Sequence, residues 1–239
     1  GIGEGFVRAL LEAGAARVYV GSRDPAAAQH LAGEFGDRAV PVALDVTDEA
    51  QVAAAAAKCT DVAIVVNNAG VFTNRLLIGA DDMSGARQEM EVNYFGTLAM
   101  CRAFAPALAA NGGGAIVNVG SHTALTGSAG TPAYVASKHA ISGLTRAIAM
   151  DYAPHGIRCN SVNMCATQTP MLDRAMAFVK SRHAAAGPDA PRATMKSSAL
   201  IGRLSTAWEQ AAVILFVASR EASYMTGALV ASDGGWTAY

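Results

Sequence analysis

The sequence predicts an α/β protein in which a parallel, doubly wound sheet carries helices on both faces. Short apolar runs typical of buried strands alternate with helical patterns along the chain. Hydrophobic residues make up 52% and charged residues 15% of the 239 residues, so the chain can bury a sizeable core. No linker, composition break or internal repeat divides it. We therefore expect a single domain over residues 1–239.

Charge and cysteine pattern exclude several classes of protein. The net charge is -1 and no basic run occurs, so neither a nucleic-acid partner nor an anionic membrane surface is expected. No apolar stretch approaches the roughly 18 residues of a membrane span, and no secretory signal is seen. The cysteines lack Cys-x-x-Cys or zinc spacing, so we expect no metal site and reduced thiols in a cytoplasmic protein. The four are Cys59, Cys101, Cys159 and Cys165.

The chain opens with a glycine-rich turn, Gly1-Ile2-Gly3-Glu4-Gly5, that leads into a helix. Val7, Leu10 and Leu11 continue the apolar face of this helix, and a short apolar strand follows at 18–21. Glycine allows a phosphate to approach the main chain, and a helix N-terminus supplies free N–H donors. A glycine turn, a helix and a strand resemble the later part of a nucleotide-binding βαβ unit.

The residues after this strand bear on the choice of nucleotide. Folds that prefer NAD place an acidic residue here for the ribose hydroxyls, whereas a 2′-phosphate requires a nearby arginine. Ser22 stands at the acidic position and Arg23 follows it, which favours NADP(H). Asp24 before Pro25 indicates a helix N-cap, but it also keeps NAD(H) open, because Asp24 could be the acidic residue shifted by a residue.

Three further strands are expected at 39–44, 62–66 and 115–119. The first ends at Asp45-Val46, the second runs into Asn67-Asn68-Ala69-Gly70, and the third delivers Ser121. Turns at the carboxyl ends of parallel strands are where such sheets bind ligands. Helices are predicted from 47 to 58 and from 86 to 110, and the second has Asn93, a poor helix former, in its interior.

Tyr134 and Lys138 lie four residues apart on a helix that begins at Pro132 and runs to Tyr152. Side chains at this spacing share one helix face. A nearby cation favours the phenolate, so we expect Lys138 to lower the pKa of Tyr134 and let it exchange a proton near neutral pH. At this spacing the two residues alone are more often an ordinary surface pair.

The last part of the chain holds a strand at 157–162, a helix from Thr206 to about 219 and a final strand at 229–230. Between them, residues 170–204 contain no strand, so we expect a lid over the edge of the sheet that shapes the substrate pocket. Four residues of this segment suggest an apolar, adaptable lining: Met171, Leu172, Met176 and Phe178.

Taken in order, these motifs resemble the short-chain dehydrogenase/reductase family, in its soluble, single-domain branch. The resemblance covers nearly the whole chain, and the ordered set is far more specific than any one motif. It rests on Gly1-Ile2-Gly3, Asp45-Val46, Asn67-Asn68-Ala69-Gly70, Asn93, Ser121, Tyr134-x-x-x-Lys138, Thr226-Gly227 and Asp233-Gly234-Gly235.

The resemblance implies a Rossmann-like fold and a role for each matching residue. Tyr134 would be the catalytic acid/base, Lys138 would tune it and bind the nicotinamide ribose, Ser121 would polarise the carbonyl, and Asn93 would support a proton-relay water. The cofactor would be bound by Gly1, Ile2, Gly3, Ser22, Arg23, Asp45, Val46, Asn68, Ala69, Gly70, Tyr134, Lys138 and Thr169.

Two departures from the family pattern stand out. The family motif Thr-Gly-x-x-x-Gly-x-Gly follows a central strand, and this sequence starts at the second glycine, so we expect that strand to precede Gly1. The family's Asn-Pro-Gly beside the nicotinamide is replaced by Asn163-Met164-Cys165. Met164 and Cys165 add bulk there, which affects how the cofactor lies and how much space is left for the substrate. A reactive role for Cys165 is the less favoured interpretation.

These observations predict an NADP(H)-preferring carbonyl reductase or alcohol dehydrogenase that transfers hydride between cofactor and a small molecule. Two alternatives share the fold: a halohydrin dehalogenase-like lyase, against which Lys138 argues, and a nucleotide sensor whose site Met164-Cys165 has spoiled. The family is commonly tetrameric or dimeric, so we expect a homotetramer or homodimer paired through long helices.

Overall fold

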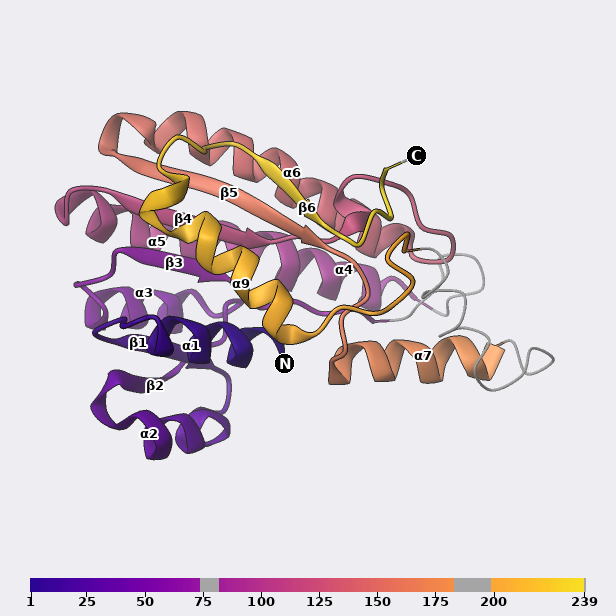
Figure 1. Ribbon diagram of the computed structural model, residues 1–239, viewed down its shortest axis with the longest axis horizontal. Helices are drawn as coiled ribbons and strands as arrows, with labels where there is room; N and C mark the ends of the chain where they lie inside the picture. Colours follow the sequence, from indigo (N-terminus) through magenta and orange to yellow (C-terminus); the bar gives the residue numbers. More distant parts are fainter. Residues whose placement is uncertain (74–81, 183–198, 239) are drawn as a thin grey trace.

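The structure is a computed structural model that describes residues 1–73, 82–182 and 199–238. The strand pairs are parallel and helices lie on both faces, which confirms the predicted Rossmann-like α/β fold of a single domain (Figure 1). The strands are β1 (Val18–Ser22), β2 (Ala39–Ala43), β3 (Ile64–Asn67), β4 (Gly114–Val119), β5 (Ile157–Met164) and β6 (Leu229–Ser232).

The strands form two sheets rather than one continuous sheet. β1 pairs with β2, and a second sheet has the order β3-β4-β5-β6. Among the described residues, neither β1 nor β2 pairs with a strand of the second sheet. The single sheet expected from the sequence is therefore divided at this point.

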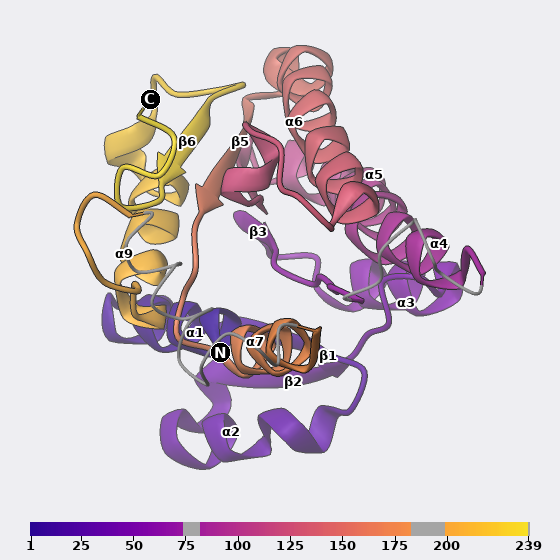
Figure 2. The same ribbon diagram turned by 90° about the vertical axis from the view of Figure 1, so that its right-hand side faces the viewer.

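Helices cover both faces of the four-stranded sheet. Figure 2 shows α5 and α6 on one side of β5 and α9 on the other. The helices are α1 (Ile2–Glu12), α2 (Gln29–Phe35), α3 (Glu49–Lys58), α4 (Ser84–Met90), α5 (Thr97–Ala110), α6 (Pro132–Tyr152), α7 (Pro170–Arg182) and α9 (Ala207–Ala218).

Helix α1 contributes to the cores of both sheets. Phe6 and Ala9 pack with buried residues of β4, β5 and α9, whereas Val7 and Leu11 pack with β1, β2 and α2. A third core, between the opposite face and α3, α5 and α6, holds Leu108, Ile116 and Ile141 among others. The apolar content of the sequence is thus distributed over both faces, as doubly wound folds require.

The predicted helix at 86–110 is divided into three parts. α4 ends at Met90, a π-helical turn η3 covers Glu91–Gly96, and α5 begins at Thr97. Asn93 lies in this turn, and the Thr97 hydroxyl donates to its carbonyl oxygen at 2.8 Å. π-Helical turns inside α-helices occur frequently at functional sites, which gives a reason for an asparagine at this place.

The starting ends of β4 and β5 approach each other closely. Gly113 has a φ of 102°, and a Cβ atom there would collide with the carbonyl of Gly156. A Cβ at Gly114 would likewise collide with the carbonyl of Ala63. Glycine is therefore required at this edge, which lies at the opposite end of the strands from Ser121.

Only part of the expected lid at 170–204 is described. Its beginning is helix α7, which lies near the N-terminus of the chain in both views (Figures 1 and 2). The Gly187–Pro191 break and the side chain of Phe178 lie outside the described residues.

Across the described residues, none of the helices combines the length and hydropathy needed to cross a bilayer.

Candidate active site

The carboxyl ends of the strands bring the predicted site residues to one edge of the structure. In the register, Asn67 pairs with Asn118, Val119 with Val162 and Met164 with Ser232. These strands end side by side, and Figure 1 shows their arrowheads pointing the same way. The segments that follow β3, β4 and β5 therefore meet, as expected for a ligand site in a parallel sheet.

Ser121 is fixed directly after β4 by its own turn. It caps the short helix η4 (His122–Ala124) and is 6% exposed. Its Oγ accepts hydrogen bonds from the Thr123 N–H at 3.2 Å and the Thr123 hydroxyl at 2.9 Å. Because both bonds use the oxygen as acceptor, the Ser121 proton remains available for donation.

Tyr134 and Lys138 lie on the same face of α6, as predicted. The Lys138 ammonium lies over the Tyr134 ring, 5.7 Å from its centroid, and donates to the Val119 carbonyl at 2.9 Å. Lys138 is 5% exposed, and burial lowers its pKa to about 8. A buried ammonium that binds one carbonyl is thus poised close to its neutral form.

The expectation that Lys138 lowers the pKa of Tyr134 is wrong for this structure. Burial raises the pKa of Tyr134 to about 12; the Ser121 side chain lowers it, and the charge of Glu89 raises it further. Desolvation of the phenolate therefore outweighs the attraction of a cation that lies over the ring. In this state Tyr134 is a protonated donor at neutral pH.

Asn93 and Lys138 both face the turn that follows β3. The Asn93 side chain accepts from the Val71 N–H at 2.8 Å and donates to the Val71 carbonyl at 3.0 Å. It also donates to the Ser137 hydroxyl at 3.0 Å. A Cβ placed at Gly70 would lie 3.4 Å from Asn93 Oδ1 and 3.7 Å from Lys138 Nζ, so the two side chains meet at this glycine.

The first turn of α1 lies against the turn after β3 and fits a dinucleotide. A Cβ at Gly3 would stand 2.7 Å from Asn68 Nδ2, so the first turn of α1 and the Asn68 side chain lie in close contact. Gly1 caps the helix without a side-chain bond, and Ile2 follows it. The helix itself leaves its first N–H groups without partners, which suits an anionic phosphate. Ala69 stands next to this contact, between Asn68 and Gly70.

The ends of β1 and β2 place the candidate ribose-binding residues together. The Leu44 N–H donates to the Ser22 carbonyl at 2.9 Å, which brings the two strand ends together. Asp24 uses its carboxylate on the Ala26 N–H at 2.9 Å, as the predicted N-cap of η1 (Pro25–Ala28), and Arg23 is exposed.

Asp45 and Val46 follow β2 at the same edge. Hydrogen bonds from the Thr47 N–H and hydroxyl, at 3.0 and 2.7 Å, lower the pKa of Asp45, and the charge of Arg23 adds to this effect. The Asp45 carboxylate is thus ionised and oriented, while Val46 packs beside it against the core.

Thr169 and Cys165 lie after β5. The Thr169 hydroxyl donates to the Thr167 carbonyl at 3.2 Å and accepts from the Leu172 N–H at 3.3 Å, so it starts α7. Burial raises the pKa of the Cys165 thiol to about 11, which disfavours the thiolate that a nucleophile needs. The bulkier Met164 is accommodated as the last, buried residue of β5.

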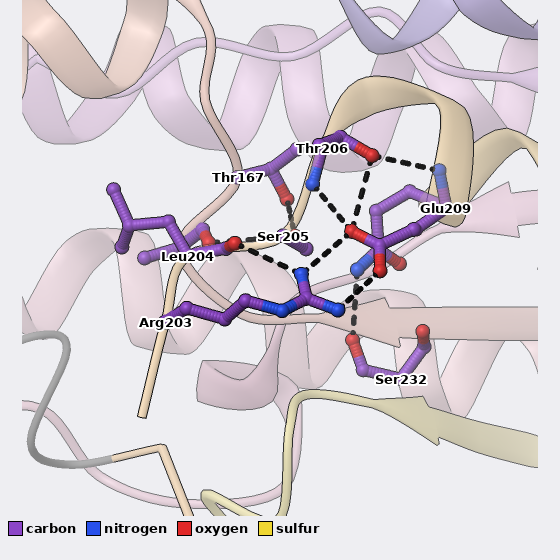
Figure 3. Close-up of polar contacts among 9 residues, drawn as sticks. Thr167, Arg203, Leu204, Ser205, Thr206, Glu209 and Ser232 are labelled. Atoms are coloured by element: carbon purple, nitrogen blue, oxygen red, sulfur yellow. Dashed lines mark hydrogen bonds and ion pairs between the residues drawn. The ribbon is translucent and has the colours of Figure 1, made fainter. Parts of the chain in front are cut away.

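A cavity of about 320 Å³ lies beside Cys165, between the start of α9 and β6. Figure 3 shows its polar wall, where Arg203 donates to both oxygens of Glu209 at 2.9 and 2.6 Å. Glu209 and Thr206 form a capping box that starts α9, and the Thr167 and Ser205 hydroxyls lie 2.8 Å apart. These contacts hold the segment after β5 in place.

In the described part of the chain, no group of three or more His, Cys, Asp or Glu side chains is arranged to hold a metal ion.

Comparisons with known proteins agree with this arrangement. A family model described as enoyl-(acyl carrier protein) reductase matches residues 1–237. The chain belongs to the short-chain dehydrogenase/reductase family. A 3beta-hydroxysteroid dehydrogenase of Mediterraneibacter gnavus is 36% identical, over 100% of this chain and 92% of the relative. A cis-4-hydroxycyclohexanecarboxylate dehydrogenase of Sinomonas cyclohexanicum is 38% identical, over 100% and 93%.

A solved short-chain dehydrogenase/reductase fold superposes closely on the chain. The structure of ElxO with NADP bound has a TM-score of 0.88 and 25% identity, over 100% of this chain and 95% of that one. The fold of the family is therefore shown over the full length of the sequence.

Sequence reasoning missed three residues of this short-chain dehydrogenase/reductase: two touch central site residues, and the third holds the segment that follows β3. Thr123 orients Ser121, Glu89 accepts two bonds from Thr73, and the Phe72 ring packs on Tyr134 with centroids 4.9 Å apart. A signal for Glu89 existed, because it lies one helical turn before Asn93 and so shares its face. Nothing in the local pattern marks Phe72 or Thr123.

Proposed function

We propose that this protein is an NADP(H)-preferring dehydrogenase/reductase that interconverts an alcohol and a ketone or aldehyde by hydride transfer. The observation that supports it is the meeting of Asn93, Ser121, Tyr134 and Lys138 at one strand edge, beside the glycine start of α1. Dehydrogenase names among the relatives support the same class.

The dinucleotide would be held by residues from successive strand ends. Gly1, Ile2 and Gly3 would approach the pyrophosphate with main-chain N–H groups, and Asp45 and Val46 would flank the adenine. Asn68, Ala69, Gly70 and Thr169 would line its central and nicotinamide parts. When bound, the cofactor supplies or accepts the hydride at its nicotinamide ring.

The side chains of the site would handle the proton and the charge on oxygen. In reduction, the carbonyl carbon gains a hydride, its C=O π bond breaks, and Tyr134 gives its phenolic proton to the oxygen. Ser121 donates a hydrogen bond to the same oxygen and stabilises the negative charge that builds there. In oxidation the alcohol O–H bond breaks, its proton goes to the Tyr134 phenolate, and the hydride leaves carbon.

Lys138 and Asn93 would complete the proton path. Lys138 would bind the nicotinamide ribose and reprotonate Tyr134, for which a pKa near 8 is well suited. Asn93, fixed on Val71, would hold a relay water beside Lys138, at the place where Gly70 leaves room for it. Both Nδ2 hydrogens of Asn93 are used on Val71 and Ser137, so the water would donate to Oδ1, which accepts one bond and has a second lone pair.

Preference for NADP(H) is supported by the chemistry at the end of β1. Arg23 is exposed beside Ser22, with its guanidinium available for a 2′-phosphate, whereas Asp24 is engaged as an N-cap. The NADP found in ElxO supports the same preference, and NAD(H) remains the weaker alternative.

For the substrate we propose a ring-borne secondary alcohol or the corresponding ketone. The two relatives above are named for a hydroxysteroid and a hydroxycyclohexanecarboxylate. Residues 170–204 would act as the lid, with Met171, Leu172 and Met176 on α7 as adaptable lining. We also propose a cytoplasmic homotetramer or homodimer.

The test is a hydride-transfer assay with cyclic and acyclic ketones and alcohols, with NADPH and with NADH. Tyr134→Phe should abolish turnover while cofactor binding, followed by fluorescence, persists. Tyr224→Phe, at a fully exposed position, is the matched control. Normal activity in the Tyr134 variant would reject the catalytic assignment. A halohydrin is added to the same panel: a lyase would convert it without a change in cofactor absorbance, and a sensor would bind nucleotide with no turnover.

A further inference from the structure

The segment that follows β3 is held at two points by side chains from one helical region. Asn93, in the π-helical turn, fixes Val71 through two hydrogen bonds. Glu89, on α4 and four residues earlier, fixes Thr73. Both side chains are buried, with Glu89 only 3% and Asn93 1% exposed. No cation of the described residues forms a salt bridge with Glu89, and a carboxylic acid buried to this degree is unusual without one.

Glu89 binds Thr73 with a single oxygen atom. Its Oε1 accepts the Thr73 N–H at 2.8 Å and the Thr73 hydroxyl at 2.9 Å. The main chain of Thr73 therefore cannot shift without breaking a hydrogen bond to a buried acceptor, which is unfavourable. With Val71 held by Asn93, both neighbours of Phe72 are fixed.

Phe72, between these two points, contacts Tyr134. The ring centroids lie 4.9 Å apart, and the ring planes are inclined by 59°. The Lys138 ammonium also lies over the Tyr134 ring, 5.7 Å from its centroid. The position of Phe72 thus limits how the Tyr134 ring can turn, and Glu89 helps to fix that position together with Asn93.

Glu89 also acts on Tyr134 through its charge. Burial raises the pKa of Glu89, and the Thr73 bonds lower it. Its negative form raises the pKa of Tyr134. Among the described elements, η3 and α6 pack most extensively against α4. The titratable residues of η3 are Glu91 and Tyr94, and those in the first turns of α6 are Tyr134, Lys138 and His139. Arg87 and Glu91, on the same helical region as Glu89, are exposed to solvent, where charges are screened.

We propose that Glu89 is a positioning residue for hydride transfer: through Thr73 it keeps Phe72 against Tyr134, and its charge acts on the Tyr134 phenol. This inference rests on the proposed function, because it assumes that Tyr134 exchanges the proton. It adds a buried carboxyl group to a site whose other members were expected from the sequence.

Two variants separate the positioning role from the charge. Glu89→Gln keeps an oxygen acceptor for both Thr73 donors but removes the charge. Thr73→Val removes one hydrogen bond but keeps the carboxylate. Alcohol oxidation needs the phenolate, so its rate falls as pH falls through the pKa of Tyr134, and loss of the negative neighbour lowers that pKa.

Because the pKa of Tyr134 is about 12, the acid limb of the kcat/KM profile for oxidation spans neutral and alkaline pH. We expect this limb to move to lower pH in Glu89→Gln by roughly half a pH unit or more, which raises kcat/KM at a fixed pH on the limb about threefold. In Thr73→Val the limb should stay in place while kcat/KM falls about threefold to tenfold through a higher KM. Glu91→Gln, which removes an exposed carboxylate two residues away, is the control and should match the wild type.

A Glu89→Gln profile that coincides with those of the wild type and Glu91→Gln would overturn the proposal, as would wild-type kinetics in Thr73→Val. Thermal unfolding checks that each variant is folded, and Thr73→Val keeps the test decisive if Glu89→Gln is not. Failure of the proposed function looks different, because the wild type would then transfer no hydride or Tyr134→Phe would remain active.

Discussion

Thr123 donates both its main-chain N–H and its hydroxyl group to Ser121 Oγ, at 3.2 and 2.9 Å. Both residues are buried, with Thr123 4% exposed. Two fixed donors occupy the acceptor side of the Ser121 oxygen, so its own proton is directed elsewhere. Two neighbouring groups are Tyr134 and His122, whose Nδ1 lies 3.5 Å from Ser121 Oγ. The turn thus presents Ser121 as a hydrogen-bond donor, which is the property that a polarising hydroxyl needs.

Replacement of Thr123 by valine should therefore reduce turnover without affecting the cofactor. Valine keeps the shape of the side chain and the main-chain bond but removes the hydroxyl donor. We expect kcat/KM to fall about tenfold, as loss of one hydrogen bond to a reacting group typically produces. Steady-state kinetics and cofactor titration check this. Unchanged kinetics would show that the N–H of Thr123 alone is sufficient to orient Ser121.

Replacement of Arg23 by alanine should separate the two cofactors. An arginine–phosphate contact is charge-assisted, so KM for NADPH should rise roughly tenfold to a hundredfold, while KM for NADH should change less than about threefold. Arg102→Ala removes another exposed arginine, whose 3.6 Å pair with Glu49 is itself exposed, and serves as the control. Equal effects on both cofactors would reject the role of Arg23 at the 2′-phosphate.

The buried Lys138 predicts a pH dependence of stability. Its pKa is about 8 in the folded protein, against about 10.4 for an unperturbed lysine. Between these values the unfolded chain binds more protons than the native protein, so the free energy of unfolding contributed by Lys138 rises with pH. This contribution is complete above about pH 10.4, decreases as pH falls and is lost below about pH 8, an effect on the order of 3 kcal/mol.

Urea unfolding at several pH values, compared between the wild type and Lys138→Met, measures this contribution. The difference between the two proteins separates the contribution of Lys138 from that of the cysteines. Burial raises the pKa of the cysteines, so they make the free energy of unfolding fall as pH rises. Tyr134 does not contribute to the slope in this window, because its raised pKa reduces stability only as pH rises beyond about 10. The same pH slope in both proteins would contradict a depressed pKa for Lys138.

Arg158 stabilises the end of α9, and its loss should destabilise the protein. Its guanidinium donates to the carbonyls of Val217, Ala218 and Ser219, and to that of Met225, at 2.9–3.2 Å. Arg158→Met keeps the apolar stem but leaves these partly buried acceptors without their donor. We expect the free energy of unfolding to fall by about 2–4 kcal/mol. Arg146→Met, at an exposed position on α6, should change it by less than about 0.5 kcal/mol.

Most elements of the fold follow from local sequence patterns. β1, β4 and β5 start within one residue of their predicted starts, because short apolar runs between turn residues specify buried strands. Thr206 forms the predicted cap of α9, and its bond pattern with Glu209 is a full capping box. Caps and periodicity are local, which is why they can be predicted from a few residues.

Features that depend on contacts between distant segments could not be predicted in this way. The π-helical turn at Asn93 depends on Val71, 22 residues away, and Arg158 reaches carbonyls about 60 residues away. The pKa of Tyr134 was predicted in the wrong direction because the sequence shows a neighbouring cation but not the degree of burial.

The edge where Gly113 and Gly114 meet Gly156 and Ala63 has a consequence for directed evolution of this chain. The main chains there leave no room for a side chain, so substitutions at Gly113 or Gly114 should be recovered as insoluble protein rather than as altered enzymes. Ser121 lies at the other end of the same strands. A library directed at new substrates can therefore vary the loops around Ser121 while it leaves the glycine edge intact.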